Sequence, residues 1–300
     1  MNKYCTLCPR MCYVNREKQT GYCGCGVKPR VARATLHFWE EPCISGERGS
    51  GAVFFGGCNL RCVFCQNREI SAGSAGMEIE VEHLTKIFLR LQEEGAHNLN
   101  LVTPGHYALS VADALRKAKE NGLNIPVVYN CGGYERVETL RLFRGLVDIY
   151  LPDFKFVTPA LAKRYCEAAD YPQRADEALA EMYTQTGETV LDEDGMMKRG
   201  VIVRHLVLPG HTKEAKAVLC RLFEQYGNRI YYSILSQYTP LAHVKTTAPE
   251  LGRTLTGREY QKVVDYALAL GVENGYIQEG KAAKESFIPA FDNTGLDCIN

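Results

Sequence analysis

Three cysteines in the stretch FFGGCNLRCVFCQN have the residue type and spacing to hold an iron–sulfur cluster that does chemistry. Cys58, Cys62 and Cys65 are spaced C-x3-C-x2-C, and Phe64 directly precedes the last of them. A [4Fe–4S] cluster is usually held by four cysteines, so three thiolates leave one iron open to bind and activate a small molecule. A structural zinc site would need a fourth ligand nearby, and neither His nor Cys occurs between Cys65 and His83. The stretch therefore predicts a catalytic iron–sulfur site.

A second group of cysteines lies near the N-terminus, in CTLCPRMCYVNREKQTGYCGC. We expect Cys5, Cys8, Cys12 and Cys23 to be ligands, with Cys25 as the alternative to Cys23. The segment is too polar and too rich in turn residues to fold around its own apolar core, so a metal would supply the missing stability. Four thiolates suit either zinc or an auxiliary iron–sulfur cluster. We favour the cluster, because the cell must already deliver one to the first site.

Composition and charge narrow the class of protein. The 300 residues are 46% hydrophobic and 23% charged, with a formal net charge of zero. This composition is ordinary for a globular enzyme, and the neutral charge does not indicate binding to nucleic acid. No apolar run approaches the roughly 18–20 residues of a membrane span. The N-terminus lacks an apolar signal-peptide core, and C-x2-C spacings in an intracellular chain indicate metal rather than disulfides. We therefore expect a cytoplasmic protein that contacts neither membrane nor nucleic acid.

Short apolar runs alternate with amphipathic segments beyond the first cysteine motif. The runs predict strands at 51–56, 98–102, 125–129, 146–151, 201–208 and 229–235, with a further short one at 274–278. Apolar residues at helical spacing predict helices between them. Six strand–helix units in series imply an α/β fold with a parallel sheet, which right-handed crossovers curl toward a barrel or a doubly wound sheet. No G-x-G-x-x-G follows any strand, which disfavours a dinucleotide-binding fold.

Polar residues follow most of these strands, where a parallel barrel would bring them to one mouth. Taken singly, each of these residues has a structural explanation, because a glycine there can serve a turn and an aspartate can cap a helix. Taken together, they predict a lined pocket. In chain order the candidates are Thr103, Gly105, His106, Asn130, Asp153, Lys155, Arg204, His205 and Gln237.

These features resemble the radical S-adenosylmethionine (SAM) superfamily, in which the open iron of a three-cysteine cluster chelates the amino and carboxylate groups of SAM. The order CTLCPRMC, VARATLHFWEEPCISGERGSGAVFFGGCNLRCVFCQN, LPDFK, RHLVLPG and SQYTP is similar to that of PflX-type proteins, named for likeness to pyruvate formate-lyase activating enzyme. The likeness runs to about residue 240. Activating enzymes bind the SAM amino group with Gly-Gly-Glu-Pro, where this chain has Thr103-Pro104-Gly105-His106.

The resemblance implies a fold and a division of the chain. The family has a partial (β/α)6 barrel of the TIM type, and the count of strand–helix units fits it. We expect this barrel over 49–280, preceded by a cysteine-rich, metal-binding extension over 1–48 and followed by a C-terminal tail over 281–300.

The resemblance also implies a reaction: reductive cleavage of SAM to a 5′-deoxyadenosyl radical that abstracts hydrogen from a substrate. Lys155, Arg204 and His205 would lie around the SAM carboxylate or the substrate. The remaining strand-end candidates would bind SAM, with Phe64 near its adenine: Thr103, Gly105, His106, Asn130, Asp153 and Gln237.

Partners follow from the same resemblance. A reducing protein such as flavodoxin or ferredoxin would supply the electron. The substrate would be a glycyl-radical enzyme, with another peptide or a small metabolite as the alternative. A multi-cluster electron-transfer protein is the alternative from another class, but a carrier needs neither a large α/β body nor an open iron.

Overall fold

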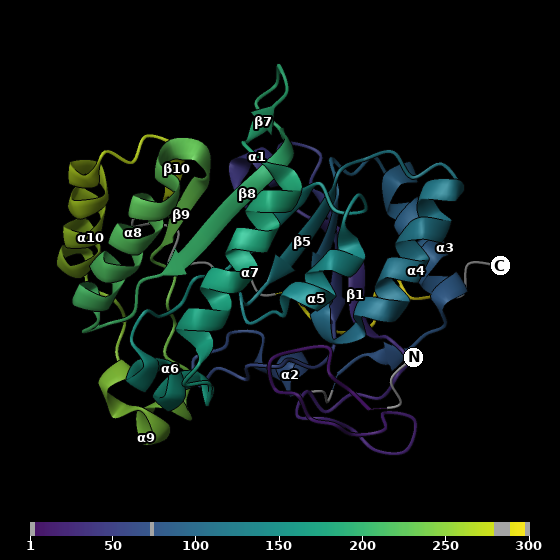
Figure 1. Cartoon of the computed structure of the whole chain (residues 1–300), viewed down its shortest axis with the longest axis horizontal. Coiled ribbons are helices and arrows are strands. Elements are labelled where there is room, and N and C mark those ends of the chain that lie inside the picture. Colours follow the sequence, from purple (N-terminus) through teal and green to yellow (C-terminus); the bar gives the residue numbers. More distant parts are fainter. Residues whose placement is uncertain (1–3, 73–74, 279–288, 298–300) are drawn as a thin grey trace.

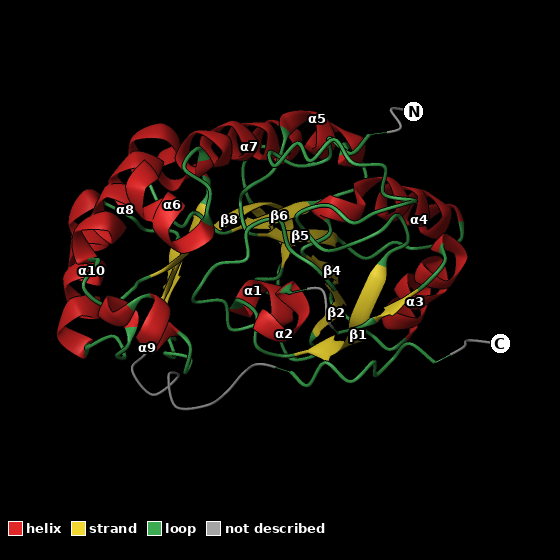
Figure 2. Cartoon of the chain, turned by 90° about the horizontal axis from the view of Figure 1, so that it is seen from below, coloured by secondary structure: helices red, strands yellow, loops and turns green. Residues whose placement is uncertain are grey.

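The computed structural model describes residues 4–72, 75–278 and 289–297. A curved sheet lies inside a shell of helices, and Figure 2 shows two short helices, α1 (Pro42–Ser45) and α2 (Arg68–Ser71), on the concave side of the sheet. The sheet has ten strands in the order β10-β9-β8-β6-β5-β4-β2-β1-β3, and β7 pairs with β8 beside this path. Its two ends, β10 and β3, do not pair with each other within the described residues, so the barrel is open.

The body of the sheet is parallel, as the alternation of strands and helices predicts. Neighbouring strands from β2 to β10 run in the same direction, and each overlaps one of the predicted runs. They are β2 (Ser50–Phe55), β4 (Leu99–Val102), β5 (Val127–Cys131), β6 (Ile149–Pro152), β8 (Met197–Leu206), β9 (Tyr231–Leu235) and β10 (Gly275–Ile277). Three antiparallel strands make the sheet mixed: β1 (Arg30–His37), β3 (Met77–Glu78) and β7 (Val190–Leu191).

The longer helices cover the outer face of the sheet (Figure 1). They form where apolar residues recur on one face: α3, for example, buries Leu84, Ile87, Phe88 and Leu91. The longer ones are α3 (Val81–Glu93), α4 (Ala108–Glu120), α6 (Pro159–Cys166), α7 (Tyr171–Thr186), α8 (Thr212–Tyr226) and α10 (Gly257–Leu270), and the four-residue ones include α5 (Val137–Leu140) and α9 (Val244–Thr247). None of the helices in the described part of the chain combines the length and the apolar character of a membrane span.

One predicted helix differs from expectation. The segment 134–145 forms only α5 and a 3-10 turn at Arg141–Phe143. The residues before α5 are buried by contacts of their own, since the Tyr134 hydroxyl donates to Asp170 and Glu135 packs beside Tyr129. These contacts fix Tyr134 and Glu135 outside the helical conformation.

The interior of the barrel is closed on one side by α1. Cys43 and Ile44 pack against strand residues that include Val128, Leu151 and Ile202. Because strand side chains alternate between faces, these contacts identify the inward set of each strand. The short helix therefore forms a floor within the curve of the sheet.

The two ends of the chain meet the sheet differently. Residues 4–29 have no helix or strand, while β1, which falls within the expected 1–48 extension, pairs with β2 along most of its length. The second half of that segment is thus part of the barrel sheet. Residues 289–297 run along β1, where the Asn293 amide donates to the Ala32 carbonyl. The rest of the expected C-terminal tail lies largely outside the described residues.

Candidate functional site

The loop after β2 carries the three cysteines to the open end of the barrel. It leaves the strand through Gly56 and Gly57, and Gly57 has φ +88°. A Cβ at Gly57 would overlap the Cys25 sulfur, so only glycine combines this backbone conformation with this close approach. Cys62 is buried, whereas Cys58 and Cys65 are partly buried.

The three thiols share one electrostatic environment. Burial raises the pKa of Cys65 to about 12, and Cys62 and Cys58 raise it as well. Burial likewise raises the pKa of Cys58, again with a contribution from Cys62, while Lys155 lowers it. Buried thiolates that repel one another need a cation, and the irons of a cluster would supply it. Among the described residues, no three His, Cys, Asp or Glu side chains are arranged so that they could hold a metal ion. The donor type of the three thiols and the electrostatic interaction of Cys65 with Cys58 and Cys62 nevertheless suit an iron–sulfur cluster.

Phe64 lies in the protein core beside the loop. It is buried, and its ring makes edge contacts with Phe156 at 6.2 Å and Tyr165 at 6.4 Å between centroids. The prediction placed this ring beside the adenine of SAM. In the structure the ring packs against Phe156 and against Tyr165 of α6, and its place beside the adenine stays a prediction.

A cavity of about 390 Å³ lies inside the barrel, next to the cysteine loop. Gln66 and Asn67, which follow Cys65, are part of its wall. The Gln66 amide donates to the Gln237 carbonyl at 2.6 Å, which ties the loop to the end of β9. Five of the strand-end candidates line this cavity: Asn130, Asp153, Lys155, Arg204 and Gln237.

An ionic network joins these side chains across the cavity. Lys155 pairs with Asp153, whose other oxygen accepts from Arg204 Nε at 3.0 Å. Arg204 also donates to Asn130 Oδ1 at 2.6 Å and to Glu40 Oε2 at 3.1 Å. Burial alone would raise the pKa of Asp153, but Lys155 and Arg204 hold it below its usual value. Burial opposes the charge of Lys155 in the same way, and Asp153 and then Cys62 raise its pKa well above normal. Lys155 thus links the cysteine loop to the carboxylates of the cavity.

The segment Thr103–His106 lies behind the loop rather than in the cavity wall. Thr103 has φ +62° and donates its amide to the Asn130 carbonyl at 2.7 Å. A Cβ at Gly105 would overlap the Glu135 carboxylate. His106 is buried with Nε2 2.8 Å from the Gly56 carbonyl. These contacts support the glycines from which the cysteine loop departs.

His205 points to the opposite face of β8 from Arg204, since neighbouring strand residues alternate. It is buried, with Nδ1 2.8 Å from the Phe154 carbonyl. Burial lowers its pKa, so the ring is held neutral. The prediction counted Arg204 and His205 together at the reaction site, but the geometry places only Arg204 in the cavity wall.

The second cysteine group is docked directly on the first. Arg10 Nε donates to the Asn59 carbonyl at 2.8 Å, and the Tyr22 hydroxyl donates to the Leu60 carbonyl at 3.4 Å. The Cys25 thiol donates to the Gly56 carbonyl at 3.3 Å. All three contacts fall on residues 56–60, at the start of the cysteine loop.

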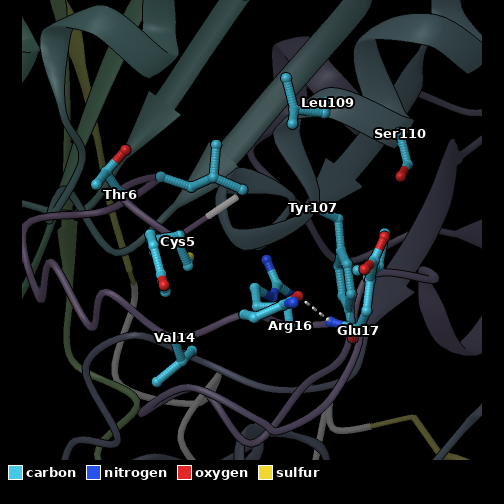
Figure 3. A pocket seen from close by; sticks show the side chains of 12 residues that line it. Cys5, Thr6, Val14, Arg16, Glu17, Tyr107, Leu109 and Ser110 are labelled. Atoms are coloured by element: carbon cyan, nitrogen blue, oxygen red, sulfur yellow. Dashed lines mark hydrogen bonds between the residues drawn. The ribbon is translucent and has the colours of Figure 1, made fainter. Parts of the chain in front are cut away.

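The four expected N-terminal ligands lie in different surroundings. Burial raises the pKa of Cys8 to about 12, and the nearby Cys12 and Cys23 add to the rise. The Cys12 sulfur accepts from the Tyr22 amide at 3.3 Å, and Cys23 lies beside Cys25. Cys5 instead lines a separate cavity of about 570 Å³ between this segment and the start of α4, seen in Figure 3 with Tyr107 and Leu109.

Glu40 and Glu41 are cavity residues that the sequence reasoning missed. Glu40 Oε1 accepts from Asn100 at 3.1 Å and from Asn130 at 3.2 Å, and Glu41 is buried next to it. Both precede α1 in the connection from β1 to β2. The available signal was the pair of acidic residues in HFWEEPCISG, directly between a strand and an apolar turn.

A parallel (β/α) barrel with a three-cysteine loop at its open end and a polar interior cavity defines an enzyme of the radical SAM type. Residues 52–223 match the family model for the radical SAM superfamily, and the chain belongs to this superfamily. Its members bind a [4Fe–4S] cluster and SAM and catalyse radical chemistry.

The chain also resembles individual proteins. The chain is 30% identical over 274 residues to the uncharacterized protein MJ0674 of Methanocaldococcus jannaschii. The aligned region covers 88% of this chain and 74% of the relative. Crystal structures of Streptococcus suis SuiB bound to the precursor peptide SuiA and to S-adenosylmethionine are similar in fold, each with a TM-score of 0.50 and 12% identity over 74% of this chain. The matched region spans about half of SuiB, 46% and 48% in the two structures.

Proposed function

We propose that Cys58, Cys62 and Cys65 hold a [4Fe–4S] cluster and that the adjoining cavity binds SAM together with a substrate from which hydrogen is abstracted. The observation that carries this proposal is the cavity wall, which begins at Gln66 beside the cysteine loop and continues through Asn130, Asp153 and Arg204. When bound, the cluster supplies the electron that cleaves SAM to a 5′-deoxyadenosyl radical. At about 390 Å³, the cavity falls in the usual range for small-molecule sites.

The protein's own residues bind and orient SAM and the substrate, and they exclude water from the cavity. Lys155 lowers the pKa of the Cys58 thiol and so favours the thiolate that a metal needs. Asp153 holds Lys155 in place, and Arg204 fixes Asp153 from the other side. This arrangement leaves Lys155 at the junction of loop and cavity, where it can hold the SAM carboxylate. Asn130 and Gln237 offer hydrogen bonds along the same wall.

The decisive test is anaerobic reconstitution with iron and sulfide, followed by incubation with dithionite and SAM. We expect 5′-deoxyadenosine from the wild-type protein and none from Cys62→Ala. Cys220→Ala is the matched control, because Cys220 lies on α8, outside both cysteine groups. A [4Fe–4S] protein whose EPR spectrum does not change when SAM is added would contradict the proposal and favour the multi-cluster electron carrier.

The substrate we propose is a glycine in a loop of a glycyl-radical enzyme, following the likeness to activating enzymes. The alternative is another peptide or a small metabolite; SuiB, similar in fold, has been crystallised with a precursor peptide. Incubation with a candidate glycyl-radical enzyme should produce a glycyl-radical EPR signal in that protein. Consumption of SAM with no such signal would favour the alternative.

We propose that the N-terminal cysteines hold an auxiliary iron–sulfur cluster that passes electrons from flavodoxin or ferredoxin to the first. The support is proximity, since Cys25 contacts the Gly56 carbonyl two residues before Cys58. Iron analysis of reconstituted protein separates this from the zinc alternative: an auxiliary [4Fe–4S] cluster raises the total to about eight irons per chain. About four irons and one zinc would overturn the relay.

A further inference from the structure

We infer that the substrate carries a cationic group, an ammonium or a guanidinium, that pairs with Glu41 at the floor of the cavity. This inference rests on the proposed function, in which the cavity holds SAM and substrate together. It goes further by naming the chemistry of the group that the cavity recognises. The observations that carry it are an unpaired buried carboxylate oxygen, the charges of the lining and the position of α1.

Glu41 has an unsatisfied oxygen. The residue is 7% exposed and lines the cavity, yet its Oε2 has no hydrogen-bond partner among the described residues. Buried carboxylate oxygens are normally paired, because leaving one unpaired costs its full desolvation. A second buried acceptor without a partner, Oδ1 of Asn100, belongs to the same group, since the Asn100 amide donates to Glu40. Burial raises the pKa of the Glu41 carboxyl. In its ionised form Glu41 Oε2 is an acceptor like Asn100 Oδ1, and a bound cation would supply the donor that both atoms lack and offset the cost of burying the charge.

The cations of the cavity are already committed elsewhere. Arg204 uses Nε for Asp153, one terminal nitrogen for Glu40 and the other for Asn130. Lys155 is paired with Asp153. The lining thus holds three carboxylates, Glu40, Glu41 and Asp153, against these two cations. Glu41 forms no ion pair of its own in the described structure, and Arg204 attracts it only at longer range.

The position of Glu41 favours the substrate over SAM as the source of this cation. The cysteine thiols interact with Lys155 at one end of the ionic network. Glu40 and Glu41 lie at the other end, beyond Asp153 and Arg204, where α1 begins at Pro42. The α1 residues Cys43 and Ile44 pack on inward strand residues and fix Glu41 inside the barrel. SAM held at the cluster would lie next to Lys155. The Glu41 end of the cavity would then remain for the substrate.

The first experiment uses the reconstituted full chain with SAM and needs no variant. Binding of Nα-acetyl-lysine methylamide and of Nα-acetyl-norleucine methylamide, a neutral analogue that lacks the ammonium group, is measured by saturation-transfer NMR. We expect the lysine probe to bind at least about tenfold more tightly, as a charge-assisted hydrogen bond in a buried site provides. Equal affinity for the two probes overturns the inference. Butylammonium and a lysine-containing hexapeptide, run in parallel, tell a free amine from a peptide side chain.

The second experiment places the effect on Glu41. Glu41→Gln keeps the shape of the side chain and should abolish the preference for the lysine probe, whereas Glu47→Gln, at an exposed position after α1, should retain it. The SAM dissociation constant should stay within about twofold in Glu41→Gln. A loss of SAM affinity as large as the loss of probe affinity would assign the pairing to SAM and overturn the inference. Formation of 5′-deoxyadenosine in the same wild-type sample tests the proposed function separately.

Discussion

The two cysteine groups are held in place by different means. Cys58, Cys62 and Cys65 sit on a loop that leaves a buried strand of the parallel sheet. Cys5, Cys8, Cys12 and Cys23 lie in a segment that has no helix or strand and is attached by side chains such as Arg10 and Tyr22. The first group is positioned by the fold, so its geometry does not depend on a metal. The second has no secondary structure to position it, although Cys23 and Cys25 reach the hydrophobic core, so we expect its order to depend on a bound metal.

The largest effect should come from removing the first group. Replacing Cys58, Cys62 and Cys65 together by alanine should eliminate 5′-deoxyadenosine formation and lower the iron content by about four per chain. The far-UV circular dichroism spectrum should not change, because the strands that carry the loop do not rely on it. A collapse of helical signal in this variant would show that the cluster holds the barrel together.

The converse change targets the second group. Cys8→Ala combined with Cys12→Ala should speed amide hydrogen exchange throughout residues 4–29 while leaving β2 and β4 protected. The catalytic cluster should still form, since its three ligands belong to another loop. Unchanged exchange in residues 4–29 would mean that side-chain docking alone orders the segment.

The ionic network offers a test of how firmly the fold positions the cavity. Arg204→Met leaves Asp153 and Glu40 without their shared partner in a buried site, and we expect a loss of about 3 kcal/mol in the free energy of unfolding. Urea denaturation measures it, and Arg199→Met, an exposed change on the same strand, is the control. Adding Asp153→Asn should recover part of the loss; strict additivity would argue against coupling.

The boundary between the two groups should respond to pH through Glu135. Burial raises the pKa of this carboxyl from 4.5 to about 8, although Tyr129 lowers it. Between these values the folded protein keeps a proton that the unfolded chain releases, so the free energy of unfolding should fall as pH rises through this window. Glu135→Gln should flatten the decline. An identical pH profile in the variant would assign the decline to other groups.

The smallest expected effect concerns Cys166, which joins α6 to the cysteine loop. Its thiol donates to the Cys62 sulfur at 3.2 Å. Hydrogen bonds to cluster sulfurs stabilise the reduced state, so Cys166→Ala should shift the reduction potential of the cluster to a lower value with iron content unchanged. Redox titration followed by EPR measures the shift, and an unchanged potential would limit Cys166 to packing.

The predictable part of this molecule is the part that follows strand periodicity. The strands overlapped their predicted runs, and the rule that polar residues after parallel strands converge brought Asn130, Asp153 and Gln237 to one cavity. The same periodicity, applied residue by residue, separates Arg204 from His205, which strand ends alone do not. Contacts between distant segments could not be predicted, because nothing in the local sequence indicates that His106 supports Gly56.

Glu40 and Glu41 illustrate a different limit. They precede α1, which enters the barrel interior from the antiparallel side of the sheet. The rule that site residues follow parallel strands does not cover this connection, which precedes a strand and reaches the cavity from its other end. Two acidic residues next to an apolar turn are ambiguous in sequence, and burial becomes visible only with the whole sheet in place.

The close approach of Gly57 to Cys25 has a consequence for engineering. The cysteine loop cannot be transplanted into another barrel as a self-contained module, because its first turn is shaped by a sulfur that belongs to a segment more than thirty residues earlier. A functional graft would have to carry residues 21–26 with residues 50–67, and any side chain placed at position 57 would push the two apart.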